Sequence, residues 1–96
     1  MNILVAYDVN TEERAGQKRL RLVAKACKAF GQRVQDSVFE CSITPTDMEK
    51  LRQRLLKIID KDEDSLRIYT LPGNREKLVE VHGRDLYVDF SDPLVI

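Results

Sequence analysis

The stretch NILVAYDVNTEERAGQKRLRLVAKACKAFG, residues 2–31, decides the fold because it couples a buried strand to an amphipathic helix. Ile3 to Tyr7 form a nearly continuous apolar run, which is typical of a central strand covered on at least one face. The polar segment from Asp8 to Thr11 ends this strand. Thr11 is expected to cap the following helix, since its side chain can accept a hydrogen bond from a free amide of the first turn.

The helix is predicted over residues 12–30. Its apolar positions recur at three- and four-residue spacing on one stripe, comprising Gly16, Leu20, Val23, Cys27 and Phe30. Glu12 and Glu13 suit the positive end of the helix dipole, and Gly31 is expected to close the helix in the usual C-terminal position.

Residues 32–43 predict two short strands around a tight turn near Asp36 and Ser37, although one long strand fits the same residues. A second helix is expected to follow, because Thr46 and Glu49 match a capping box. Its core-facing positions are Met48, Leu51, Leu55, Ile58 and Ile59.

Residues 65–71 alternate in a way that predicts a further strand, and short strands are expected at 78–81 and 86–90. The resulting β-α-β-β-α-β order predicts an α+β, ferredoxin-like domain spanning residues 1–96. The trailing segment, residues 78–96, has no place in a four-stranded sheet. We therefore expect this segment at a homodimer interface, paired with the edge of the partner's sheet.

Composition excludes several classes of protein. Apolar residues make up 43% of the chain and charged residues 33%, which indicates a globular domain. The longest apolar run is too short to span a membrane, and the N-terminus has no basic segment or cleavage site typical of a signal peptide. Cys27 and Cys41 form no C-x-x-C motif, so reduced thiols in a cytoplasmic protein are expected. Glycine-rich nucleotide-binding motifs are missing.

The formal net charge is zero, but the charges are unevenly distributed. Between Arg14 and Gln35 the chain has no acidic residue. Cations on one side of the predicted helix are Arg14, Lys18, Arg21, Lys25 and Lys28. Together with Arg33, such a surface suits the phosphates of a nucleic-acid backbone. The alternative is an ordinary solvated helix face, although such faces usually carry interleaved acids for ion pairing.

Asp8 is the candidate metal ligand and catalytic residue, because its carboxylate should emerge where the first strand ends. The alternative is that Asp8 accepts hydrogen bonds from the loop ahead of the helix. A single carboxylate is a poor site for Mg²⁺, which prefers an octahedral shell of oxygens. If a dimer axis passes near this strand end, two copies of Asp8 could share one ion, which could activate water and stabilise charge on a phosphodiester.

Several strings resemble the CRISPR-associated protein 2 family. They are NILVAYDV ending near Asp8, KRLRLVAKACKAFGQRVQDSVFEC from Lys18 to Cys41, DSLRIYTL from Asp64, and the closing DFSDPLVI. The similarity covers nearly the whole chain in the same order, and GQRVQDSVFEC is its most specific part.

The resemblance implies a ferredoxin-like homodimer of the CRISPR adaptation module, with the C-terminal strand packed on the partner's sheet. It implies that Asp8 is the Mg²⁺ ligand. It also implies either Mg²⁺-dependent cleavage of RNA or double-stranded DNA, or a non-catalytic role in which the protein bridges CRISPR integrase subunits and holds the DNA that becomes a new spacer. For the bridging role, the expected DNA contacts are Arg14, Lys18, Arg21, Lys25 and Arg33. The sequence leaves both hypotheses open.

Overall fold

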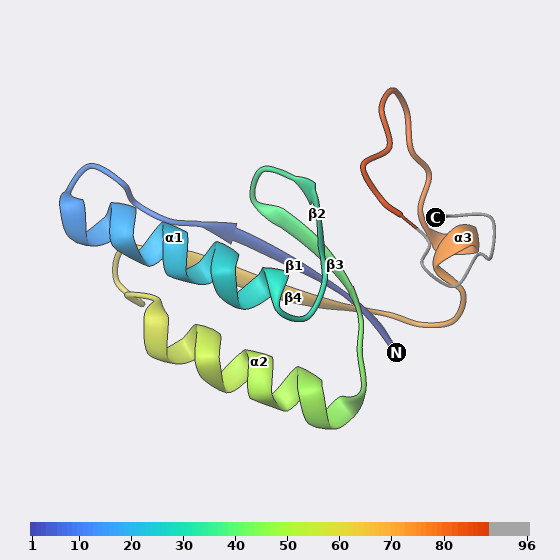
Figure 1. The fold of residues 1–96 in the computed structure, drawn as a ribbon, viewed down its shortest axis with the longest axis horizontal. Helices are drawn as coiled ribbons and strands as arrows, with labels where there is room; N and C mark the ends of the chain where they lie inside the picture. The colour runs from blue at the N-terminus through green and yellow to red at the C-terminus, as the bar shows by residue number, and fades with distance from the viewer. Residues whose placement is uncertain (89–96) are drawn as a thin grey trace.

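A computed structural model of the chain describes residues 1–88 (Figure 1). Its elements in chain order are β1 (Asn2–Asp8), α1 (Arg14–Lys28), β2 (Gln32–Gln35), β3 (Val38–Ser42), α2 (Pro45–Ile58), β4 (Ser65–Leu71) and the short α3 (Arg75–Leu78). The first six elements have the predicted β-α-β-β-α-β order. The two short strands β2 and β3 flank Asp36 and Ser37, so the hairpin interpretation of this region is confirmed.

The strands form one antiparallel sheet in the order β2-β3-β1-β4, which is the ferredoxin-like arrangement predicted from the sequence. Helices α1 and α2 lie side by side on one face of this sheet and run in opposite directions (Figure 1). Alternate β1 residues Ile3, Val5 and Tyr7 are buried beneath the helices. The other face of the sheet carries neither long helix, and its β1 side chains Asn2, Leu4 and Ala6 are partly exposed.

Two glycines allow close packing around α1. A Cβ atom at Gly16 would lie 1.8 Å from the carbonyl oxygen of Asn10, in the loop between β1 and α1. A Cβ atom at Gly31 would lie 2.3 Å from Sγ of Cys41. Gly31 has no positive φ, so the expectation that it closes the helix as a left-handed cap is wrong. This glycine is instead required because β3 passes close to the backbone after α1.

Both helix starts differ from the predictions. Helix α1 begins at Arg14, after Glu13, and no side chain caps it. Helix α2 begins at Pro45, and its cap is Thr44, whose Oγ1 accepts a hydrogen bond from the Asp47 amide at 3.1 Å. Proline is favoured at the first helical position because its fixed φ suits the helix and it has no N–H to satisfy. The predicted capping box at Thr46 is therefore wrong by two residues.

The C-terminal segment does not form the predicted strands within the part of the chain that the structure describes. Residues 75–78 form α3, and residues 79–88 contain no strand. Residues 89 and 90 of the second expected strand, like the rest of the trailing segment from 89 to 96, lie outside the described residues. A buried ion pair anchors α3 to the sheet, because Arg75 donates to both carboxylate oxygens of Glu40, at 2.9 and 3.0 Å.

Residues 79–82 and 84–86 line a groove of about 420 Å³ together with Leu4, Val34 and Val38 from the sheet face that α1 and α2 leave uncovered. Of the helices in residues 1–88, none has the length and apolar character needed to cross a membrane.

Candidate nucleic-acid interface and metal site

Asp8 lies at the end of β1, where its register partner on β4 is Ser65. The side chain is exposed, as expected for a residue that follows a buried strand. The alternative interpretation gave this carboxylate a role in holding the loop. Within residues 1–88 two of the loop amides are bonded elsewhere, since the Asn10 amide donates to Asp64 and the Glu12 amide donates to Oδ1 of Asn10. The Asp8 carboxylate takes part in neither of these two hydrogen bonds.

The loop after Asp8 is fixed by Asp64, which the sequence analysis did not single out. Arg19 of α1 donates to both oxygens of this carboxylate, at 2.8 and 3.2 Å. The amides of Asn10 and Asp60 also donate to it, at 3.1 and 2.9 Å. The Asp64 side chain is fully buried, and the Arg19 guanidinium holds the pKa of its carboxyl below the usual range. No sequence signal distinguishes Asp64 from the other acids of its run.

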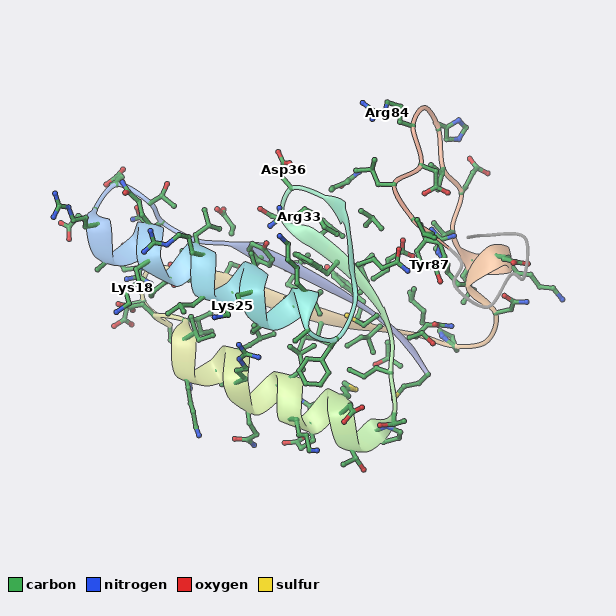
Figure 2. The ribbon with its side chains drawn as sticks, viewed as in Figure 1. Lys18, Lys25, Arg33, Asp36, Arg84 and Tyr87 are labelled. Carbon is green, nitrogen blue, oxygen red and sulfur yellow. The ribbon has the colours of Figure 1, made fainter. Side chains whose placement is uncertain are left out.

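The predicted cationic stripe is present on α1 and points away from the core. All of its members are exposed, namely Arg14, Lys18, Arg21, Lys25 and Lys28. In residues 1–88, none of them has a carboxylate within 4.0 Å. Figure 2 shows Lys18 and Lys25 on the same side of the helix. Cations one or two turns apart without acid partners can meet successive phosphates of a backbone.

Arg33 belongs to β2 and not to this helix. Its guanidinium carbon lies 5.3 Å from the centre of the Phe39 ring, and its side chain remains exposed (Figure 2). Stacking on the ring restrains the cation without neutralising it. Arg33 therefore adds a positive group beside the hairpin, next to the end of α1.

Besides Glu40, Glu80 and Asp85, which line the groove on the sheet face away from α1, acidic side chains gather at the start of α1. A surface pocket there is lined by Glu12, Glu13, Asp60 and Glu63 among other residues. The α1 stripe and this acidic pocket therefore lie along one layer of the molecule, with the pocket at its end.

The cysteines belong to the core, as predicted for Cys27. Both Cys27 and Cys41 are buried and free. Burial raises the pKa of Cys27 to about 12 and that of Cys41 to about 11, so neither forms a thiolate at neutral pH.

Residues 1–78 match the sequence model of the family described as CRISPR associated protein Cas2. The chain belongs to the Cas2 family. This confirms the resemblance identified in the sequence and covers every strand of the sheet, both long helices and α3.

Other members of the Cas2 family match the chain over its length. The CRISPR-associated endoribonuclease Cas2 1 of Moorella thermoacetica is 54% identical over 96 residues, which are 100% of both chains. The CRISPR-associated endonuclease Cas2 of Halalkalibacterium halodurans is 48% identical over 95 residues, 99% of each chain. The crystal structure of Streptococcus pyogenes Cas2 is similar with a TM-score of 0.78 and 55% identity, covering 86% of this chain and 100% of that one.

Residues 1–88 of one copy of this Cas2-family protein do not complete a magnesium site at Asp8. Its carboxylate is a suitable hard oxygen ligand, and it is exposed. Among residues 1–88, however, no three acidic, histidine or cysteine side chains lie close enough together to hold a metal ion.

Sequence reasoning also missed a set of cations on α2 in this Cas2-family protein. Lys50, Arg54 and Lys57 are exposed and recur at helical spacing. A detectable signal was the lack of acidic residues between Lys50 and Ile59.

Proposed function

We propose that this protein acts in CRISPR adaptation as a homodimer that binds duplex nucleic acid and cleaves phosphodiesters in a Mg²⁺-dependent reaction. The observation that carries the proposal is the α1 stripe, whose cations are exposed and have no carboxylate within 4.0 Å in residues 1–88. Unpaired cations release counterions from the backbone that they bind, and this supplies affinity for any sequence.

The uncovered face of the sheet supports the homodimer. Tyr69 lies opposite Leu4 in the register of β1 and β4, and 44% of its surface is exposed. Leu78, Val81 and Leu86 of the C-terminal segment are also more than 40% exposed. A chain of 96 residues has a small core, so burying these side chains against a second copy would add substantially to its stability.

Cleavage requires the dimer, because two Asp8 carboxylates are needed to hold one ion. The names of the Moorella and Halalkalibacterium relatives, which describe an endoribonuclease and an endonuclease, support this assignment. The bound ion would stabilise negative charge on the phosphodiester and lower the pKa of water. The protein's own contribution is to hold Asp8 at a strand end and to position the backbone on the α1 stripe and Arg33.

A second candidate is a non-catalytic bridge between CRISPR integrase subunits, which holds the DNA fragment that becomes a spacer. The observation that favours it is the thin ligand set, since one chain contributes a single exposed carboxylate at the strand end. Binding through α1 and Arg33 is common to both candidates, whereas Asp8 matters only for cleavage.

The test is the substitution Asp8→Asn, with Asp36→Asn at the hairpin tip as a matched exposed control. Both variants should fold as the wild type does, because each residue is exposed. We expect Asp8→Asn to abolish Mg²⁺-dependent cleavage of RNA and duplex DNA while integrase-dependent spacer capture persists. The control should retain both. A purified wild-type protein that cuts neither substrate would leave the bridging role alone.

A further inference from the structure

A second line of cations runs along α2, beside the stripe on α1. Lys50, Arg54 and Lys57 follow one another at four- and three-residue intervals, so they share one side of the helix. With Gln53, these residues line a shallow open groove on the protein surface, which also includes Thr46 and Glu49. We call Lys50, Arg54 and Lys57 the α2 row.

Arg54 of the α2 row lies close to the neighbouring helix α1. Arg54 lies near enough to Cys27 of α1 that its positive charge opposes the rise in the pKa of Cys27 caused by burial. The two helices pack against each other in opposite directions (Figure 1). In Figure 2, Lys18 and Lys25 lie along the border of α1 with α2. The seam between the helices is therefore flanked by cations from both sides.

The acids near the α2 row are already neutralised. Glu49 accepts hydrogen bonds from Arg52 and from Gln53, and the bond from Gln53 is the main reason that its pKa is lowered. Asp47 lies 3.9 Å from Lys50. In the described residues, Arg54 and Lys57 have no carboxylate within 4.0 Å. Their charges remain available to an external anion.

We propose that the seam between α1 and α2 is a track for a nucleic-acid backbone, with Arg54 and Lys57 binding phosphates alongside those bound by the α1 stripe. The inference rests on the proposed function, because it assigns further contacts to the same ligand. Cations repeat along both helices, which fits an extended polyanion better than a single small anion. The acidic pocket at the start of α1 repels phosphates and limits the track at that end.

The experiment measures the affinity for a duplex DNA by fluorescence anisotropy over a series of salt concentrations. Three double variants are compared with the wild type. Arg54→Gln with Lys57→Gln tests the α2 row, and Lys18→Gln with Lys25→Gln tests the α1 stripe. Lys61→Gln with Lys77→Gln removes two exposed cations from outside both helices and is the matched control.

Each duplex phosphate contact contributes about 0.9 to the slope of log K against log salt. The Arg54→Gln, Lys57→Gln variant loses two contacts, so its slope should be about 2 units shallower. It should also bind at least about tenfold more weakly at 0.1 M salt. The control should retain the wild-type slope. Circular dichroism melting should be unchanged, since the substituted side chains are exposed.

The outcomes separate the two proposals. If the α1 variant weakens binding and the α2 variant retains the wild-type affinity and slope, the track is wrong and the proposed function stands. An α2 variant that binds more weakly with an unchanged slope would also overturn the track, because the loss would not come from phosphate contacts. A wild-type protein with no affinity for nucleic acid would remove the proposed function itself.

Discussion

Asp64 gathers three segments of the chain around one buried carboxylate. Its partners come from the β1–α1 loop, from α1 and from the turn after α2. A buried carboxylate is costly unless its oxygens are hydrogen-bonded, and here both oxygens accept from two donors. The loop that follows Asp8 thereby has a fixed shape without any help from Asp8 itself.

Substituting Asp64→Asn should destabilise the protein by about 2 kcal/mol at pH 7, because hydrogen bonds to a charged group are lost. The folded-state pKa of Asp64 is lowered, so its stabilising contribution is present above about pH 4 and is lost as the pH falls through the folded pKa. Urea unfolding at pH 7 and pH 3 should show the difference from wild type shrinking at pH 3. Asp62→Asn, an exposed neighbour, should have little effect. A pH-independent difference would contradict this account.

Gly16→Ala tests whether an alanine at this helix position raises or lowers the free energy of unfolding. In an ordinary helix interior the change stabilises by about 1 kcal/mol. Here the new Cβ atom would meet the Asn10 carbonyl at 1.8 Å, so the backbone must move and we expect a net loss of about 1–3 kcal/mol. Thermal unfolding measures it. The reverse change at an exposed α1 site, Ala15→Gly, should cost about 1 kcal/mol or less, and a stabilised Gly16→Ala variant would refute the close packing.

At the scale of elements, strong periodicity predicted most of the fold, whereas the ends of helices depended on local chemistry. The stripe of α1 and the alternation of β4 each repeat several times. The repeated spacing is therefore enough to identify α1 as a helix and β4 as a strand. A cap is set by one residue, and both Thr44 and Thr46 satisfy the pattern. Only backbone geometry decides between them.

The cap therefore offers a direct comparison of two threonines. Thr44→Ala should cost about 1 kcal/mol, because the Asp47 amide loses its acceptor. Thr46→Ala lies within the helix and should change the free energy of unfolding by less than about 0.5 kcal/mol. Chemical denaturation of both variants measures the difference. Equal losses would restore the predicted capping box.

The candidate site likewise has a part that the sequence could predict and a part that it could not. The α1 stripe was predictable because spacing along a helix fixes which side chains share a side. The bonding of the loop around Asn10 was not, since Asp64 is distant in sequence and indistinguishable from its acidic neighbours. The strands expected at 78–81 and 86–90 also depend on contacts beyond local sequence. In residues 79–88, short apolar runs lie over the sheet without pairing as strands.

For the whole molecule, α1 and α2 cover one face of the sheet, and the other face is where we propose self-association. Tyr69→Glu places a charge on that uncovered face and should shift the protein towards monomer, with at least about a tenfold weaker dimer. Light scattering over a range of protein concentrations measures this. Leu56→Glu, an equally exposed apolar position on α2, should leave the dimer intact. Dissociation by Leu56→Glu alone would place the interface on the helical side.

The outer strand β2 has one further consequence, for solubility. Its pairing with β3 shifts between Arg33 and Gln35, and the side-chain amide of Gln32 bonds to both backbone groups of Val88. An irregular, charged and partly occupied edge is a poor template for another chain's strand. Filament growth from this edge is thereby disfavoured. Because the protein has no net charge to make its copies repel one another, this irregular edge is what opposes amyloid-like stacking at β2.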